Sequence, residues 1–229
     1  MKLSIIIPVN NEEKCVAQTI EKISKVLLPV EKEIVIVNDG STDKTFKILE
    51  ELKSIYNFKL INLEKNQGKG HAIKSGLKEI TGNYLLIQDA DLEYDPIDIP
   101  KLLGKIDKNT SAVYGNRGIK KWPKKGYHYI LGAKMLTTLI NILFKTKLKD
   151  VYTGYKLFNL EKINLQNLTS SGFEFEAEVT CKILKNKGKI VETNISYNPR
   201  NKKEGKKIKL KDALKGLLTI VKNRLGLDF

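Results

Sequence analysis

The chain has 229 residues, 41% of them hydrophobic, and a formal net charge of +15 at pH 7. This length and composition are those of a globular protein with a substantial core, and they exclude a disordered or fibrous chain. No apolar run approaches the roughly 18 residues of a membrane span, and the opening residues MKLSIIIPVNNEE have too short an apolar core for a signal peptide.

Apolar runs alternate with amphipathic segments in the first half of the chain. The expected strands are 2–9, 33–39, 58–63, 83–89 and 111–116. The expected helices are 11–28, 43–56, 69–80 and 96–107, the last with Asp95 as its N-cap and Pro96 at its first position. This alternation predicts an α/β fold with a Rossmann-like, mostly parallel sheet that is covered by helices on both faces.

The second half of the chain is less regular. We expect a helix over 128–145, a short mixed segment over 151–160, a helix over 173–186, a strand over 189–197 and a terminal helix over 208–225. One apolar face of the terminal helix carries Leu214, Leu217, Leu218, Val221 and Leu225, with lysines beside it. Such a face either packs against the sheet or lies on an anionic membrane, and the pattern leaves both open.

Polar motifs follow four of the five strands in the first half. They read PVNNEE, NDGSTD, DADLE and GNR, and they follow the first, second, fourth and fifth strands. In parallel sheets, ligands bind at the carboxyl ends of the strands, so these motifs predict one site along that edge.

The motif DADLE gathers the carboxylates of Asp89, Asp91 and Glu93 in a basic protein. If they continued the strand, neighbouring carboxylates would lie about 6.6 Å apart and repel by roughly 2.5 kcal/mol at an effective dielectric constant of about 20. The segment 80–97 contains no lysine that could compensate them. An acidic turn with Asp95 as a helix cap explains Asp95 but not the others. We therefore predict a divalent cation, Mg²⁺ or Mn²⁺, that holds a diphosphate.

Two kinds of basic residue could neutralise the rest of such a ligand. Lys69 stands where a helix is expected to begin, and free backbone N–H groups there favour anions. Only three of the 41 basic residues are arginines, Arg117, Arg200 and Arg224. Because a guanidinium is a planar bidentate donor, its sparing use indicates specific roles for Arg117 and Arg200.

The motifs IIIPVNNEE, VIVNDGSTDKT, NQGKGHAIKSG, YLLIQDADLEYDP and VYGNR together resemble the family-2 glycosyltransferases of the GT-A fold. The later motifs DVYTGYKLF, GFEFEAEV and ISYNPRNKKEGKKI are similar to those of dolichyl- or polyprenyl-phosphate sugar synthases. The resemblance covers nearly the whole chain in the order of the family. It implies a glycosyltransferase domain over 1–200, with a nucleotide-sugar part over 1–118 and an acceptor part over 119–200, and then a basic loop and amphipathic helix over 201–229.

The resemblance also implies roles for individual residues. The implied donor-binding residues are Pro8, Asn10, Glu12, Val37, Asp39, Lys69, Asp89, Ala90 and Asp91. Those implied for the chemistry are Asp89, Asp91 and Arg117, and the implied metal ligands are Asp91 and Glu93. The implied ligands of the acceptor phosphate are Arg117, Arg200 and Lys206. Relatives carry an aromatic residue where this chain has Asn10, so base stacking is not expected there.

The implied reaction is a single displacement with inversion, in which a polyprenyl phosphate attacks the sugar of a nucleotide-sugar donor. A phosphate is already anionic at pH 7, so no strong general base is required. The segment GYKLF looks closer to glucosyl-type relatives and favours a UDP-sugar over GDP-mannose. The lipid acceptor implies peripheral attachment at the cytoplasmic face of a membrane, where a membrane partner protein could assist; no nucleic-acid partner is expected.

Other readings of the motifs remain open. A transferase acting on a glycan or protein hydroxyl needs a positioned base, for which Glu174, Glu176 and Glu178 are candidates. A sugar-nucleotide nucleotidyltransferase shares a similar sheet, but its glycine-rich first loop is missing from PVNNEEKC. A nucleic-acid-binding module would leave the carboxylates unexplained.

Overall fold

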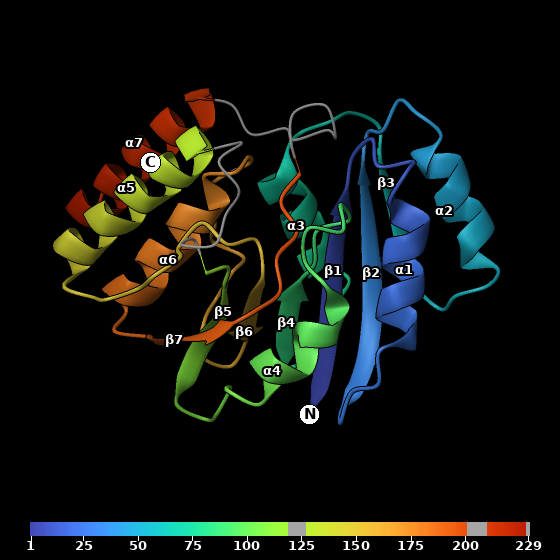
Figure 1. Cartoon of the computed structure of the whole chain (residues 1–229), viewed down its shortest axis with the longest axis horizontal. Helices are drawn as coiled ribbons and strands as arrows, with labels where there is room; N and C mark the ends of the chain where they lie inside the picture. Colours follow the sequence, from blue (N-terminus) through green and yellow to red (C-terminus); the bar gives the residue numbers. More distant parts are fainter. Residues whose placement is uncertain (119–126, 201–209, 228–229) are drawn as a thin grey trace.

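The computed structural model describes residues 1–118, 127–200 and 210–227. Within these ranges seven strands form one mixed sheet in the order β3-β2-β1-β4-β6-β5-β7 (Figure 1). The strands are β1 (Lys2–Val9), β2 (Glu31–Asp39), β3 (Lys59–Leu63), β4 (Tyr84–Ile87), β5 (Thr110–Asn116), β6 (Lys156–Asn159) and β7 (Lys189–Asn194). β6 runs antiparallel to both of its neighbours, β4 and β5, while the other paired strands are parallel.

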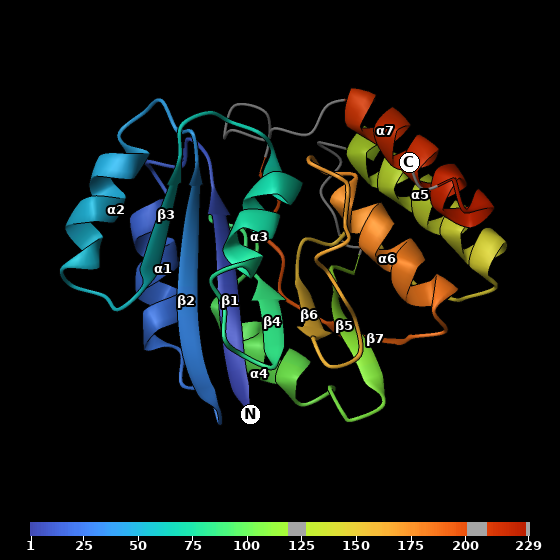
Figure 2. The same cartoon turned by 180° about the vertical axis from the view of Figure 1, so that it is seen from behind.

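Helices cover both faces of the sheet (Figures 1 and 2). On one face lie α1 (Val16–Lys25), α2 (Thr45–Lys53), the 3-10 turn η1 (Pro96–Asp98) and α4 (Ile99–Leu103); on the other lie α3 (Lys69–Leu77) and α6 (Phe175–Lys185). Alternation along β1 explains the two layers, because Ile5 and Ile7 pack with the first set and Ile6 with the second. The α/β architecture is the one that the sequence predicted.

Two further helices form a layer outside α6. These are α5 (Tyr127–Phe144) and α7 (Leu210–Leu225), which lie side by side at one end of the molecule (Figures 1 and 2). Leu136 and Ile140 of α5 and Ile220 of α7 pack against Ala177 and Cys181 of α6. The sequence placed both helices correctly, within one or two residues at each end.

The apolar face that the sequence singled out on α7 points away from this core. Its members Leu214 and Leu218 are 59% and 53% exposed, whereas Gly216 and Ile220 are buried. Residues advance by about 100° along a helix, so these two pairs lie on opposite sides of α7. In the described structure this face of α7 is a surface of the molecule and not part of its core. On α5 the apolar residues are divided between surface and core, since Met135 is exposed and Leu136 is buried.

Several predicted elements differ in extent. The helix expected from Asn11 begins only at Val16, because Asn11 has a left-handed φ of 51° and the chain turns through Glu12 before the helix starts. The helix expected over 96–107 divides into η1 and α4, which ends at Leu103 with Gly104 as its C-cap. Asp95 is the predicted cap, since its carboxylate accepts a hydrogen bond from Ile97 N at 3.1 Å.

Two differences bear directly on the site. The strand expected over 83–89 ends at Ile87, so the acidic motif forms a turn instead of continuing the strand. The mixed segment 151–160 contains β6, which was not predicted as a strand. A four-residue run that is buried throughout has no alternation to reveal it.

At the opposite, amino edge of the sheet, Glu33 ties three segments together. Its carboxylate accepts hydrogen bonds from Ser4 Oγ, Thr81 N, Thr81 Oγ1 and Gly82 N, and it pairs with Lys2 at 3.0 Å. Burial opposes the charge, but these hydrogen bonds outweigh it and lower the pKa of Glu33 to about 2. The ionised carboxylate is therefore preferred in the folded state.

This shift predicts a pH-dependent stability. Because the folded pKa lies below the unfolded value, the stabilisation by Glu33 is present above about pH 4.5 and is lost as the pH falls toward about 2. We expect Glu33→Gln to lower the free energy of unfolding by about 2 kcal/mol at pH 7. Urea titrations should show this difference shrinking toward zero near pH 2; an equal loss at both pH values would contradict the assignment.

Candidate active site

Four polar motifs meet at the carboxyl edge of the sheet, as predicted. β1, β2 and β4 are mutually parallel, and β5 runs in the same direction because the antiparallel β6 lies between it and β4. After β4, the chain leaves the sheet and turns at Leu92, which has a φ of 60°. Thr19 of α1 holds this turn by donating a hydrogen bond to Ala90 O at 2.9 Å. Asp91 and Glu93 therefore lie on a turn that a hydrogen bond from α1 holds in place.

A single guanidinium joins the carboxylates of two of these motifs. Arg200 Nη1 lies 2.9 Å from Glu12 Oε2, and Arg200 Nη2 lies 2.7 Å from Asp91 Oδ2. The other oxygen of Asp91 accepts a hydrogen bond from Glu93 N at 3.1 Å. Arg200 therefore lies where positive charge is needed, between the first strand's loop and the acidic turn.

Glu93 holds the segment that carries Arg200. Its two carboxylate oxygens accept hydrogen bonds from Arg200 N at 2.8 Å and from Tyr197 Oη at 2.7 Å. Tyr94 and Tyr197 also pair as an isolated bridge. Glu93 consequently positions residues 197–200 beside the acidic turn, and its predicted role as a metal ligand would require some of these bonds to break.

The environment of Asp91 favours the binding of a cation. Burial, together with the negative charges of Asp89 and Glu93, raises the pKa of Asp91 to about 7, although Arg200 acts in the opposite direction. Burial and the neighbouring carboxylates both disfavour the ionised form of Asp91, and positive charge close to it favours that form. A cation that reaches Asp91 would supply that charge.

Behind Asp89 lies a row of alternating buried charges. Lys69 Nζ lies 2.8 Å from Asp89 Oδ1 and 3.0 Å from Glu176 Oε1, and Glu176 Oε2 pairs with Lys156 Nζ. We call Asp89, Lys69, Glu176 and Lys156 the buried charge row. Burial disfavours the charges of Lys69 and Glu176, but their opposite neighbours outweigh it, so the pKa of Lys69 is raised and that of Glu176 is lowered.

The second strand's motif supports the loop that precedes α3. The Asp39 carboxylate accepts hydrogen bonds from Gln67 N at 2.9 Å and Gly68 N at 2.8 Å. Asn10 Nδ2 donates to Asp39 O at 2.7 Å and so fastens the end of β1 to the end of β2. Gly68 has a φ of 98° and lies so close to Ser171 O that a side chain there would collide with it. These contacts shape the edge where the sequence predicts that a nucleoside binds.

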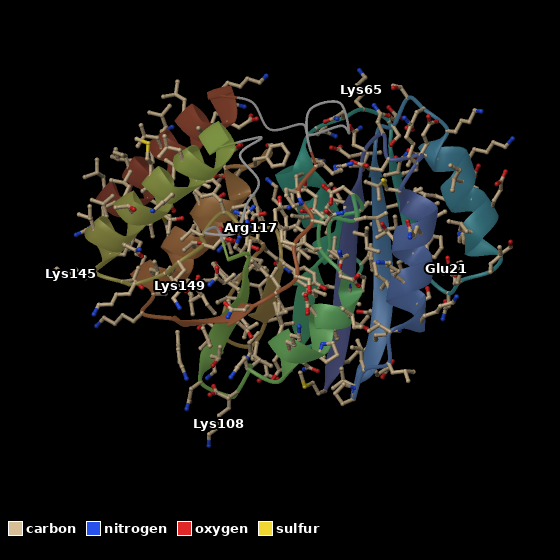
Figure 3. The ribbon with its side chains drawn as sticks, in the orientation of Figure 1. Glu21, Lys65, Lys108, Arg117, Lys145 and Lys149 are labelled. Carbon is tan, nitrogen blue, oxygen red and sulfur yellow. The ribbon has the colours of Figure 1, made fainter. Side chains whose placement is uncertain are left out.

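Arg117 lies deeper than a surface phosphate ligand. Figure 3 shows it among the crowded side chains in the middle of the view, while Lys65, Lys108 and Lys145 lie at the outline of the molecule, and its side chain is only 7% exposed. Its Nε and Nη2 donate to the two oxygens of Asp150, both at 2.7 Å, and its guanidinium lies 5.2 Å from the centre of the Tyr197 ring. The structure links Arg117 to the acidic turn through Tyr197 and Glu93. Its role in phosphate binding stays a prediction.

The structure brings most of the predicted residues together and separates a few. Pro8 is half-buried at the end of β1, next to the site. Val37 is fully buried, with its side chain in the core against α3, so it does not face the edge. Lys206 lies outside the described residues.

Some residues of the site were not singled out by the sequence reasoning. Tyr197 and Asp150 contact the predicted site residues Glu93 and Arg117, and Lys156 pairs with Glu176, which was considered only as a candidate base. All four lie in the motifs DVYTGYKLF, GFEFEAEV and ISYNPR, which was the available signal. Their pairings could not be read from the sequence because the partners are far apart in it.

The described residues contain no group of three or more His, Cys, Asp and Glu side chains able to hold a metal ion. Mg²⁺ commonly uses only one or two protein carboxylates together with phosphates of the substrate. Asp91, with its cationic neighbour and its raised pKa, fits such a shared site.

Comparison with known proteins agrees with this geometry. Residues 4–164 match the family Glycosyl transferase family 2. The chain is 33% identical over 201 residues to an uncharacterized protein of Methanocaldococcus jannaschii, covering 83% of this chain and 86% of that protein. It is 31% identical over 212 residues to the dolichol-phosphate mannosyltransferase of Pyrococcus furiosus, covering 90% of this chain but only 59% of that enzyme.

A solved structure has the same fold. Glucosyl-3-phosphoglycerate synthase from Mycobacterium tuberculosis, in complex with Mn²⁺, UDP and glucosyl-3-phosphoglycerate, superposes with a TM-score of 0.75 at 20% identity. The match covers all of this chain and 81% of the synthase. The fold is therefore the GT-A fold of nucleotide-sugar glycosyltransferases. By sequence, the chain belongs to glycosyl transferase family 2.

The pair of Arg117 and Asp150 gives a stability prediction. Asp150→Asn removes the charge of the carboxylate that pairs with the buried Arg117 guanidinium through two hydrogen bonds, so we expect the free energy of unfolding to fall by about 3–5 kcal/mol. Glu21→Gln is the control, because the pair of Glu21 and Lys25 is exposed and should contribute less than about 1 kcal/mol. Urea titration measures both; similar small losses would show that the Arg117 pair is not a buried structural contact.

Proposed function

We propose that this protein transfers a sugar from a nucleotide-sugar donor to a dolichyl or polyprenyl phosphate, with inversion and with Mg²⁺ or Mn²⁺. The observation that carries the proposal is the convergence of Glu12, Asp91 and Arg200 at the carboxyl edge of the sheet. Charge of both signs at that edge is suited to a diphosphate with its cation. The similarity to a dolichol-phosphate mannosyltransferase supports the lipid phosphate as acceptor.

In this proposal Asp91 holds the cation together with the donor diphosphate, with Glu93 as a second ligand. A bound cation supplies charge stabilisation for the departing nucleoside diphosphate. For Asp91 Oδ2 to become available, Arg200 has to leave it, and the guanidinium would then face the phosphates. The Nε of Arg200 is buried and accounts for no hydrogen bond among the described residues, so it can serve a phosphate oxygen.

The chemical step needs little from the chain beyond positioning. An oxygen of the acceptor phosphate bonds to the anomeric carbon as the bond from that carbon to the diphosphate breaks. Asp89 and Ala90 border the sugar, and Asp39 and Glu12 border the nucleoside. Lys206 and Arg117 would bind the acceptor phosphate. No proton has to be removed from an ionised phosphate, so orientation and charge stabilisation provide the catalysis.

The alternative acceptor, a glycan or protein hydroxyl, needs a general base. Of the three candidates, Glu176 is buried between Lys69 and Lys156, and Glu178 is buried and accepts hydrogen bonds from Thr169 N and Ser170 N. Lysine partners and hydrogen bonds hold the pKa of both carboxylates below the usual range. Neither of these two carboxylates is suited to remove a proton. Glu174, whose Oε1 accepts a hydrogen bond from Gly172 N at 2.9 Å, is therefore the candidate base that a hydroxyl acceptor would require.

The outer faces of α5 and α7 supply a means of meeting a lipid acceptor. Among the described residues no helix has the length and apolarity to cross a bilayer. The exposed leucines of α7 lie beside exposed Lys211, Lys215 and Lys222. An apolar helix face bordered by lysines binds the surface of an anionic membrane. We therefore place the protein peripherally on the cytoplasmic face of a membrane.

A donor screen tests the proposal. UDP-glucose, UDP-N-acetylglucosamine and GDP-mannose are each incubated with a short polyprenyl phosphate, with Mg²⁺, with Mn²⁺ or with a chelator. We expect sugar transfer from one donor, with UDP-sugars favoured, and its loss in chelator. Transfer to a sugar hydroxyl but not to the lipid phosphate would overturn the acceptor.

Asp91→Ala removes the carboxylate that we assign to the cation. We expect sugar transfer to fall by at least about 10³-fold while the thermal midpoint stays within a few degrees, because the loss affects charge stabilisation of the leaving group. Asp95→Asn is a matched change in the same turn that retains the cap and should keep activity. Full activity of Asp91→Ala would remove the metal role.

Membrane attachment can be tested on α7. Replacing Leu214 and Leu218 by Glu should abolish co-sedimentation with vesicles that contain about 30% phosphatidylglycerol, because charge replaces the apolar face. Leu27 and Ile55 are exposed apolar residues beyond the other end of the sheet, at 91% and 69%, and their replacement by Glu is the control. Equal binding of the two double variants would show that α7 is not the attachment surface.

A further inference from the structure

The inner half of the buried charge row has no part in the proposed reaction. Lys156, on β6, is 0% exposed, and its ammonium contacts Glu176, Val151 O and Thr153 O, and lies 4.7 Å from the centre of the Tyr114 ring. An ammonium buried this deeply is costly unless every donor is satisfied, and here acceptors surround it. A methionine of similar length would fill the same space without that cost.

A continuous series of ion pairs connects Lys156 to Asp89 at the carboxyl edge of the sheet. Each contact joins opposite charges: Lys156 to Glu176, Glu176 to Lys69 at 3.0 Å, and Lys69 to Asp89 at 2.8 Å. Two ammonium and two carboxylate groups leave the row neutral. Lys69 is held from both sides, so its ammonium cannot follow Asp89 or withdraw from it without weakening one pair.

A second contact runs from Lys156 to Asp89 through the backbone. Lys156 binds the carbonyl oxygens of Val151 and Thr153, which lie just before Gly154. A Cβ on Gly154 would collide with Asp89 Oδ2 and would lie 3.0 Å from Lys69 Nζ. The loop that Lys156 fastens therefore packs directly against the Asp89 carboxylate.

We propose that Lys156 and Glu176 are positioning residues that fix the Asp89 carboxylate, through Lys69 and through Gly154, in the orientation from which it contacts the donor. The inference rests on the proposed function in one respect, namely that Asp89 borders the nucleotide-sugar. Neither residue touches the donor itself. Their contribution is to prevent Asp89 from turning away when no ligand is bound, which lowers the cost of ordering the site on binding.

The test uses a double variant that keeps the row neutral, Lys156→Met with Glu176→Gln. Both replacements approximate the native shapes, so the fold should persist, and circular dichroism melting checks this. Calorimetry with UDP and with GDP, in Mn²⁺, should give a nucleotide affinity at least about fivefold weaker than that of the native chain. Glu33→Gln, which removes a half-buried and paired carboxylate at the far edge, should leave that affinity unchanged.

Combining the double variant with Asp89→Asn distinguishes a role in positioning Asp89 from a general structural role. In an Asp89→Asn background the double variant should weaken nucleotide binding by less than about twofold further, because the carboxylate that the row orients is already gone. A fivefold loss in both backgrounds would show a merely structural role and would overturn the inference. So would native affinity of the double variant.

Gly154→Ala tests the backbone route without changing any charge. It should weaken nucleotide binding about as much as the double variant does, since the added methyl group displaces Asp89. Gly132→Ala on α5 is the control, because a Cβ there has no neighbour within 4 Å. An unchanged affinity of Gly154→Ala would remove this route.

The nucleotide-binding measurements do not depend on which acceptor the protein uses. If the native chain binds nucleotide but transfers no sugar to polyprenyl phosphate, the proposed function fails, while the coupling between the row and Asp89 is still measured. If the chain transfers sugar and the row variants bind nucleotide normally, the inference alone fails. If the native chain binds neither UDP nor GDP, both fail.

Discussion

Ion pairs between distant parts of the chain determine whether the carboxyl edge of this sheet can form. Glu12, Asp89 and Asp91 gather there, and like charges at such distances repel. Their counter-charges come from elsewhere: Arg200 is 109 residues beyond Asp91 and 188 beyond Glu12. The edge is therefore electrostatically complete only when the second half of the chain has folded against the first.

The basic residues at this edge differ in how firmly they are held, and this difference matters for binding a ligand. The cations at the edge are of two kinds. Lys69 is buried and held by two carboxylates, whereas Arg200 lies on the segment after β7 and pairs with Asp91. In the function that we propose, Lys69 would be a fixed charge that orients the ligand, and Arg200 would be an exchangeable charge that moves from Asp91 to the phosphates as a nucleoside diphosphate binds.

How far the sequence predicted this structure depended on the range of the interactions. The strands and helices of the first half followed from local hydrophobic alternation, and the site's location followed from the polar motifs at strand ends. The turn at Leu92 was missed because a left-handed residue at a non-glycine position has no sequence signature. The pairing of Lys156 with Glu176 was missed because nothing local marks a lysine as buried. Whether the apolar face of α7 packs against the protein or lies on its surface could not be decided, since an amphipathic pattern does not show what the face contacts.

The antiparallel strand β6 has a consequence for how the molecule holds together. It follows β5 in the chain but is inserted between β4 and β5, so the sheet cannot be divided into an early and a late half. A chain that stopped after β5 would leave β4 with an open hydrogen-bonding edge and β5 without the neighbour that joins it to the sheet. The strands before and after β5 thus belong to one cooperative folding unit, whose non-local strand pairing makes folding slow and partial unfolding costly.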